Sequence, residues 1–244
     1  MFDFLKRKKE PQPVFEVLGT DMHCHLVPGV DDGSKSFEES LECINIMYSL
    51  GYRKMFITPH FQFPRFPNKE EDITRRYNEL KNELKKCGCP MELIGVGGEY
   101  RIDDSFAARV DNPNFLRVGD KVLVELSLHQ NRMGVEETLF ELGMKDYDVI
   151  LAHPERYPYL NVHSPVLSQL KEQGVYFQCN ILSISGFYGE QAQKTALEYL
   201  KQGWVEYLGT DMHNTRYAQA LKDATNNKKV LKVLETYEFL NKNL

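Results

Sequence analysis

The sequence predicts an α/β fold, specifically a distorted TIM-like (β/α)7 barrel in a single domain. Short β-rich runs alternate with helical patterns, which favours parallel strands joined by helical crossovers. The hexapeptide LGTDMH occurs at Leu18–His23 and again at Leu208–His213, and each copy ends an apolar stretch. A closed barrel brings its first and last strands side by side and would unite the two copies. A doubly wound open sheet has the same local signature, but the positions of the charged residues favour the barrel.

The predicted strands are short β-rich runs. They are Phe15–Asp21, Lys54–Thr58, Glu92–Val96, Lys121–Leu126, Asp148–Ala152, Val175–Cys179 and Val205–Gly209. Seven such units suit a barrel of this size.

Helical patterns fill the gaps between the strands. Ser36 and Glu39 have the spacing of a capping box, and apolar residues then follow at helical intervals. Ser164 followed by Pro165 predicts a second helix start, with a cap and then proline. The remaining predicted helices are Ile73–Lys86, Val135–Leu142, Glu190–Gln202 and two C-terminal stretches.

The composition is that of a globular protein, with 42% hydrophobic and 27% charged residues. A net charge of −5 gives no electrostatic signature for nucleic acid. No apolar run approaches the ~20 residues of a membrane span, so the chain is expected not to span a membrane. Residues 1–14 are predicted to form a flexible basic tail ahead of a catalytic barrel over residues 15–244. An electrostatic contact of this tail with an anionic membrane or a partner is the alternative.

The five cysteines carry no recognisable chemistry. An odd count without an export signal predicts free thiols in the reducing cytoplasm. None is followed by arginine six positions on, so the chain lacks the Cys-x5-Arg loop of cysteine-dependent phosphatases. Cys24 lies between His23 and His25, and on a strand it would face away from both, as a buried packing residue.

Six of the seven predicted strands deliver a histidine or a carboxylate at the C-terminal end, the face where barrels of this type carry the active site. One such residue alone is usually a structural or solvated group, but the joint pattern predicts a site. Nitrogen and carboxylate ligands without thiolate suit Mn, Fe, Zn or Mg, and so many ligands suit two or three ions. His129 and His163 are assigned to loop and surface. The candidates are His23, His25, Asp31, Asp32, His60, Glu99, Glu125, His153, Asp211 and His213.

The segment His25–Ser36, HLVPGVDDGSKS, is the most specific motif, and Thr-Pro-His, His-Pro-Glu-Arg-Tyr and Asp-x-His-Asn accompany it. These motifs resemble the PHP (polymerase and histidinol phosphatase) superfamily over nearly the whole chain. They are most similar to the bacterial capsule and exopolysaccharide protein-tyrosine phosphatases. The resemblance implies a cytoplasmic metal-dependent phosphatase whose substrate is the phosphotyrosine tail of a membrane tyrosine autokinase.

The resemblance also implies three divalent ions, manganese first, with Fe, Zn or Mg as alternatives. Asp31 would be the neighbour of a ligand, and Asp21 would orient a ligating imidazole. The first ion would be held by His23, His25, Glu99 and Asp211, the second by Glu99, Glu125 and His153, and the third by Asp32, His60 and His213.

Arg156 would bind the substrate phosphate, since a planar guanidinium suits that role, and Arg216 is a second candidate. Surface ion pairs are the alternative for both. Asp211 and His213 are assigned to the catalytic machinery as well as to the metals.

The loop Phe61–Pro67 departs from the family pattern, because relatives often carry a second histidine or basic residues there. Its three phenylalanines around Arg65 either clamp a phenyl ring or pack the loop onto the barrel rim. The same alternatives stand for Phe187 and Tyr188.

Three other functions remain open at this point. A small-molecule phosphomonoesterase of the histidinol-phosphatase type would share the metals. A PHP nuclease or proofreading module is disfavoured by the acidic composition. A metal-stabilised adaptor for a membrane kinase would not need the complete ligand set.

Overall fold

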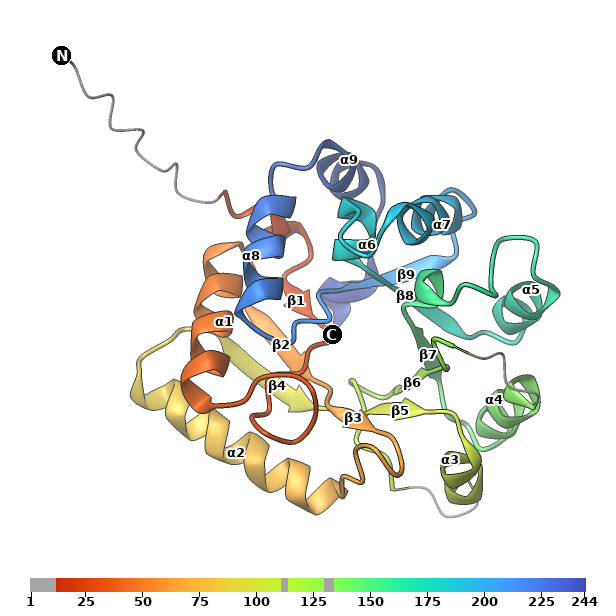
Figure 1. Cartoon of the computed structure of the whole chain (residues 1–244), viewed down its shortest axis with the longest axis horizontal. Coiled ribbons are helices and arrows are strands. Elements are labelled where there is room, and N and C mark those ends of the chain that lie inside the picture. Colours follow the sequence, from red (N-terminus) through yellow and green to blue (C-terminus); the bar gives the residue numbers. More distant parts are fainter. Residues whose placement is uncertain (1–11, 111–113, 130–133) are drawn as a thin grey trace.

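The computed structural model describes residues 12–110, 114–129 and 134–244. Every strand pair in this part of the chain is parallel, and the strands lie around the centre of the molecule with helices outside them (Figure 1). The strands are β1 (Thr20–Asp21), β2 (Lys54–Ile57), β3 (His60–Phe61), β4 (Glu92–Val96), β5 (Glu99–Arg101), β6 (Val122–Glu125), β7 (Val149–Ala152), β8 (Tyr176–Asn180) and β9 (Val205–Gly209).

The helices form an outer layer around these strands (Figure 1). The α-helices are α1 (Phe37–Ser49), α2 (Glu70–Lys86), α3 (Asp104–Arg109), α4 (Val135–Met144), α5 (Pro165–Glu172), α6 (Ile181–Ser185), α7 (Glu190–Lys201), α8 (Thr215–Ala224) and α9 (Lys228–Thr236). Three short 3-10 helices are η1 (Val14–Val17), η2 (Pro154–Arg156) and η3 (Leu240–Asn243). None of the helices in the described part of the chain combines the length and the apolar character that a membrane crossing requires.

The strands divide into two sheets, in the orders β1-β2-β4 and β3-β5-β6-β7-β8-β9. The chain leaves β2 and enters β3 within three residues, and it passes from β4 to β5 in the same way. Each of these pairs is therefore one barrel strand that is interrupted where it changes sheet. Counted so, the structure has the seven strand positions that the sequence predicts.

The two copies of the hexapeptide lie side by side, as predicted. Cys24 forms a parallel bridge with Met212, and the amide of Asp211 donates to the carbonyl of His23 at 2.9 Å. The carboxylate of Asp21 accepts hydrogen bonds from the amide and the hydroxyl of Thr210, at 3.0 and 2.8 Å. These contacts join the first and last strand positions and bring both Asp-x-His motifs to one place.

The predicted first strand, Phe15–Asp21, is wrong over most of its length. Residues Val14–Val17 form η1, and only Thr20 and Asp21 are in strand. The buried side chains here are Phe15 and Leu18, three residues apart, whereas Glu16 and Val17 are exposed. That spacing suits a 3-10 turn, in which residues i and i+3 lie above one another.

The other six predicted strands are confirmed to within two residues at each end, and so are most helices. The short elements β3, β5, α3 and α6 were not predicted, because two to six residues carry too little periodicity. The predicted tail over residues 1–14 falls mainly outside the described residues, and Val14 already belongs to η1.

Buried apolar side chains from η1 to α9 form one large cluster, and a second, smaller cluster contains Leu123 of β6, Ile150 of β7 and Tyr207 of β9. The central strands β6 and β7 are buried along their whole length, as expected for parallel strands covered on both faces. The polar residues at their C-terminal ends are consequently held on rigid supports.

Candidate metal centre

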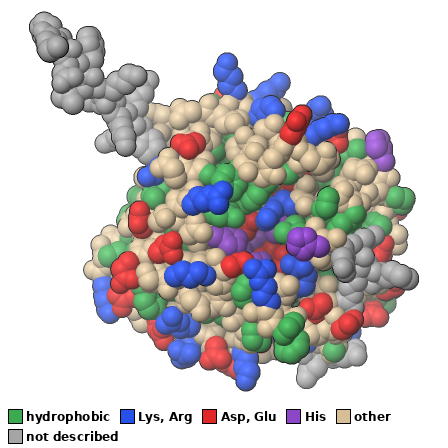
Figure 2. Space-filling model, viewed as in Figure 1, with side chains coloured by type: hydrophobic (Ala, Val, Ile, Leu, Met, Phe, Trp, Pro, Cys, Tyr) green, Lys and Arg blue, Asp and Glu red, His purple; other side chains and the backbone are tan. Residues whose placement is uncertain are grey.

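Histidine side chains gather in a hollow at the middle of the face shown in Figure 2, with basic side chains around them. The hollow is a cavity of about 340 Å³ at the C-terminal ends of the strands. Six of the nine predicted metal ligands line it, together with Arg156 and Arg216. The other three, His23, His25 and Glu99, are fully buried.

Four of these buried groups meet at one point. The Nε2 atoms of His23 and His25 are 3.2 Å apart, and they lie 3.4 and 3.3 Å from Oε2 of Glu99. Oδ1 of Asp211 is 3.7 Å from the first imidazole and 3.3 Å from the second. A tetrahedral ion with ligands at about 2.0–2.1 Å separates its ligand atoms by roughly 3.4 Å. The spacing matches the first ligand set that the family resemblance implies.

A second group forms around Asp32, whose Oδ1 lies 3.5 Å from Nε2 of His60 and 3.6 Å from Nε2 of His213. The ring of His213 stacks on that of His25, with centroids 4.1 Å apart. The structure thus also brings together the three residues of the third implied set.

The remaining implied set, Glu99, Glu125 and His153, is brought together only in part. Nε2 of His153 lies 2.8 Å from Oε1 of Glu99. Glu125 instead contacts Nδ1 of His60 at 3.2 Å and the guanidinium of Arg101 at 3.0 Å. His60 therefore faces two groups of ligands, one through each ring nitrogen.

Several atoms of the cluster are buried without a hydrogen-bond partner in the described part of the chain. They are Oδ1 of Asp32, Nδ1 of His60, Oε2 of Glu99, Nδ1 of His153 and Oδ1 of Asp211. A buried polar atom without a partner is costly, and converging carboxylates repel one another. Divalent cations at this position would satisfy the three carboxylate oxygens, so the residues fit a metal centre.

Two hydrogen bonds orient the central imidazoles. Gln178 accepts from Nδ1 of His23 at 2.8 Å, and Asp31 accepts from Nδ1 of His25 at the same distance. Both bonds turn Nε2 toward the cluster, the arrangement that fixes the tautomer of a metal ligand. Asp31 therefore lies behind His25, a predicted ligand.

The role expected for Asp21 is wrong, because both of its oxygens bond to Thr210 and neither reaches an imidazole. Gln178 holds His23 instead, and it was not predicted from the sequence. Its signal was an amide between the apolar residues Phe177 and Cys179, buried in β8.

The imidazoles and carboxylates of the cluster stabilise one another's charged forms. Burial disfavours the charged imidazole of His60, but Glu99 and Glu125 raise its pKa to about 10. Burial likewise opposes the charged carboxylate of Glu99, yet the neighbouring His23 and His60 hold its pKa well below the usual range. The nearby imidazole of His213 lowers the pKa of Asp32. Without metal, His60 therefore retains its proton at neutral pH, and metal binding must displace it.

The backbone is strained at two of the predicted ligands. His153 has φ of 35° and Asp211 has φ of 51°, a region that non-glycine residues seldom adopt. Both residues directly follow a buried strand or its short extension, and this conformation turns their side chains into the cluster. At Gly209 a Cβ atom would lie 2.7 Å from Nε2 of Gln178 and 3.0 Å from Cβ of His23, which explains the glycine of the second hexapeptide.

Four arginines line the cavity. Arg156, which lies in η2, donates to Oδ2 of Asp211 at 2.8 Å, and its guanidinium lies 4.3 Å from the ring centroid of Tyr188. Arg65 pairs with Asp32 at 3.0 Å, and the exposed Arg216 lies over the ring of Phe187. The sequence analysis missed Arg101, although it is two positions after Glu99 on the same strand.

The aromatic residues of the loop Phe61–Pro67 have different surroundings. Phe61 is buried against Tyr100, with centroids 4.6 Å apart, so it packs the loop onto the barrel. Phe66 stacks on His60 at 5.3 Å, and Phe63 is 66% exposed. The packing alternative therefore holds for Phe61, and the exposed Phe63 is not among the residues that line the cavity over the cluster.

Among the other aromatic and histidine candidates, Phe187 and Tyr188 contact each other and Tyr217 beside the cavity. His129 and His163 are exposed, in accord with their assignment to loop and surface.

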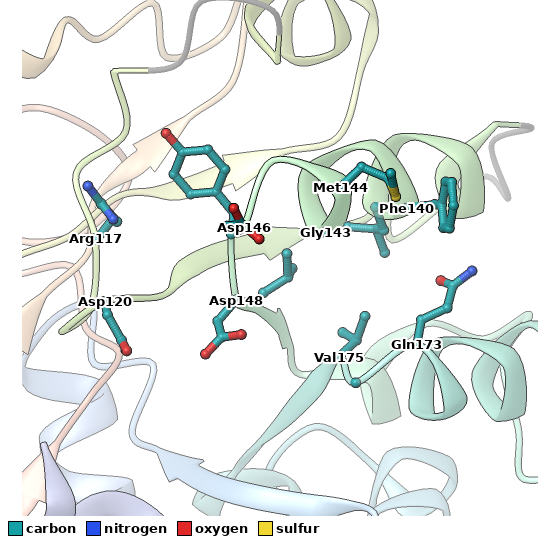
Figure 3. A pocket seen from close by; sticks show the side chains of 13 residues that line it. Arg117, Asp120, Phe140, Gly143, Met144, Asp146, Asp148, Gln173 and Val175 are labelled. Carbon is teal, nitrogen blue, oxygen red and sulfur yellow. The ribbon is translucent and has the colours of Figure 1, made fainter.

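A further cavity of about 590 Å³ lies at the opposite ends of the strands, between α4 and the turn after α5 (Figure 3). Phe140, Met144 and three aspartates line it, and its lining includes no histidine or cysteine. Conserved chemistry in barrels of this type is found at the other face. The cavity of Figure 3 is therefore not the candidate active site.

Comparison with known proteins gives one consistent result. Residues 19–234 match the family model described as "Capsular polysaccharide synthesis, CpsB/CapC". CapC of Staphylococcus aureus is 28% identical over 228 residues, which cover 91% of this chain and 88% of CapC. CpsB of Streptococcus pneumoniae, named a tyrosine-protein phosphatase, is 28% identical over 201 residues, with 80% of this chain and 82% of CpsB covered.

A solved structure has the same fold. This structure comes from a set of crystal structures of Bacillus subtilis YwqE and S. pneumoniae CpsB, described as metal-dependent tyrosine phosphatases. That structure superposes with a TM-score of 0.75 at 24% identity and covers 92% of this chain and 94% of its own. The likeness confirms the predicted fold class.

Proposed function

Because the chain belongs to the CpsB/CapC family of capsular polysaccharide synthesis proteins, we propose that it is a metal-dependent protein-tyrosine phosphatase. Its relative CpsB bears the name of that activity. The observation that carries the proposal is the buried cluster of carboxylates and imidazoles whose inward atoms have no partner in the described chain. The cluster lies under a cavity with a guanidinium in its wall. A phosphomonoesterase needs such groups to bind the phosphate and to activate water.

We assign three divalent ions to this cluster, with manganese first, because the donors are nitrogen and carboxylate oxygen without thiolate. When bound, such ions supply Lewis acidity, which neutralises phosphoryl oxygens and makes water nucleophilic near neutral pH. His23, His25, Glu99 and Asp211 would hold one ion, and Asp32, His60 and His213 another. Glu125 and His153, with Glu99 shared, complete the ligand set.

Arg156 is the residue that we expect to bind the substrate phosphate. Its guanidinium is only 20% exposed and is held by Asp211 and Tyr188, so it is oriented before substrate arrives. A planar, oriented guanidinium can donate two parallel hydrogen bonds to a phosphate and neutralise charge in the transition state. Asp211 therefore serves twice, because Oδ2 positions Arg156 while Oδ1 faces the cluster.

Two other features favour an aryl phosphate. The leaving phenolate of tyrosine, with a pKa of about 10, needs less protonation than an alkoxide. Arg216, His213 and the half-buried Tyr217 line the same cavity and can contact the ring or the phosphate. We place Arg216 second to Arg156, because it is exposed and has no carboxylate partner among the described residues.

We further propose that the substrate is the phosphotyrosine tail of a membrane tyrosine autokinase and that the protein acts in the cytoplasm. The support is the family's description, capsular polysaccharide synthesis. A cavity lined by four arginines also suits an acidic phosphopeptide.

The test is phosphate release from a phosphotyrosine peptide by metal-stripped protein, with Mn, Fe, Zn or Mg added back singly. We expect one metal to restore activity, and His153→Ala to abolish it while the exposed control His163→Ala retains it. Activity after exhaustive chelation would contradict a metal-dependent mechanism. Hydrolysis of histidinol phosphate in place of the peptide would indicate a small-molecule phosphatase.

A further inference from the structure

A second cavity opens beside the catalytic one, and we propose that it binds an aromatic or large aliphatic side chain next to the phosphotyrosine of the substrate. It has a volume of about 350 Å³ and lies between the loop Phe61–Pro67 and the β5–α3 segment. The proposal rests on the proposed phosphatase function and adds a specificity subsite to it.

The walls of this subsite are rings held by the core. Phe61, Tyr100 and Phe106 are almost fully buried, and Tyr100 contacts the other two rings, stacking on Phe61 at 4.6 Å. Phe63 stands at the mouth with 66% of its surface exposed, one of the most exposed large apolar side chains of the described chain. Rings that are already packed lose little freedom when a further ring binds against them.

The subsite is continuous with the catalytic cavity, because Gln62 and Arg101 line both. Two hydrogen bonds between Gln62 and Phe66 close the loop into a hairpin, which forms the wall between the cavities. On the catalytic side Phe66 lies on His60 and Arg65 pairs with Asp32. A peptide with phosphotyrosine in one cavity would therefore cross this hairpin with its next side chain at the other.

The charges of the subsite favour an apolar ligand over an acidic one. Arg101 is paired with Glu125, and Arg109 is paired with Glu70 and lies over the ring of Tyr100. Both guanidinium groups are thus neutralised, and Lys69 at the edge is the cation that makes no ion pair within the described chain. An acidic side chain would find one solvated lysine, whereas an aromatic one would find several rings.

The test uses the manganese-loaded full chain and phosphotyrosine peptides that carry Phe, Leu, Ala or Glu on either side of the phosphotyrosine. At the position on one side of the phosphotyrosine, we expect Phe to lower KM about tenfold relative to Ala. Apolar pockets discriminate between side chains by about this factor. Phe63→Ala, which removes the mouth, and Ser105→Trp, which fills the cavity, should each abolish the preference. Hydrolysis of 4-nitrophenyl phosphate should stay unchanged in both variants.

The matched control is Phe140→Ala, which removes another exposed ring, 53% accessible, at the cavity of Figure 3. It should retain the full preference for Phe. Calorimetry gives an independent readout, because a peptide with a non-hydrolysable phosphonate analogue should show the same preference when it binds metal-free protein. Phe63 is exposed, so Phe63→Ala keeps the test valid if Ser105→Trp proves unstable.

The proposal is overturned if the wild type hydrolyses Phe and Ala peptides with equal KM, or if the preference survives in both variants. A preference for Glu would overturn it in favour of an acidic subsite at Lys69. These outcomes leave the phosphatase function intact. Failure to hydrolyse any phosphotyrosine peptide or aryl phosphate with any metal would instead overturn the proposed function, and the subsite with it.

Discussion

At the scale of single residues, Arg156 illustrates how position gives a common side chain a specific role. Several arginines of the described chain pair with carboxylates at the surface, for example Arg75 with Asp72 and Glu79. Such exposed pairs contribute little to stability. Arg156 is held by a buried carboxylate and an aromatic ring beside an open cavity, so its free donors are directed at a ligand.

We therefore expect Arg156→Lys to lower kcat/KM for a phosphotyrosine peptide by at least about 100-fold, because lysine cannot make the planar, bidentate contact. The fold should be unaffected. Arg53→Lys is the matched control, since Arg53 also lies over a tyrosine ring, at 4.5 Å from Tyr48, but away from the cluster. Steady-state kinetics measure both, and equal activities of the two variants would remove Arg156 from the proposed mechanism.

Gln178 shows the same dependence on position. Its carbonyl oxygen accepts from His23, and its amide donates to Asn180, which in turn donates to Asp211. This chain of bonds links two of the proposed ligands from behind.

Replacement of Gln178 by Ala should weaken metal binding about 10- to 100-fold, because His23 loses the bond that fixes its tautomer and ring orientation. Gln219→Ala is the control, since Gln219 bonds to Asp223 on the exposed side of α8. Competition with a calibrated chelator measures the affinity. Identical affinities for the two variants would contradict an orienting role for Gln178.

At the scale of elements, the two predicted helix starts show what a local motif can and cannot establish. Ser36 caps α1, because its hydroxyl accepts from the amide of Glu39 at 3.3 Å. Ser164 occupies the equivalent position before α5 but does not cap it, and its hydroxyl accepts from the amide of Asn161 instead. Pro165 at the first helical position lacks an amide hydrogen, so that helix start depends less on a cap.

Ser36→Ala should consequently lower the free energy of unfolding by about 1 kcal/mol, the usual contribution of an N-cap. Ser164→Ala should cost less, since it removes only an exposed turn bond. Urea unfolding followed by circular dichroism would compare the two. An equal or larger loss in Ser164→Ala would mean that the caps were assigned wrongly.

The strands differ in how well the sequence pattern predicts them. Buried runs such as those of β6 and β7 are unambiguous in sequence, and they were predicted correctly. The first strand was predicted wrongly because Phe15 and Leu18 follow a 3-10 spacing that an apolar run conceals. The two-residue β3 exists only because its neighbour β5 lies beside it.

At the scale of the whole molecule, the ring of strands creates the charge arrangement of the cluster. Residues from the first strand position to the last converge on one buried region, where carboxylates and imidazoles raise or lower one another's pKa. The pKa of His60 is raised to about 10 in the metal-free protein, so this imidazole carries a proton at neutral pH.

Metal binding should therefore release protons and strengthen as the pH rises from 6.5 to 8.5, by up to about tenfold per pH unit for each proton displaced. Bound metal should also raise the melting temperature, because only the folded chain offers the site. Calorimetry in two buffers of different ionisation enthalpy counts the protons released. A pH-independent affinity without proton release would contradict protonated imidazoles in the metal-free cluster.

Local patterns predict which residue types stand at the strand ends, because strand and helix periodicity and the repeated hexapeptide can be recognised in short segments. How these residues combine depends on the fold. It placed Gln178 behind His23 across 155 residues of chain, paired Glu125 with His60 and Arg101, and turned Asp21 toward Thr210. The reason is that each of these contacts joins segments far apart in the chain, and their meeting depends on how the strands assemble around the core rather than on any local pattern.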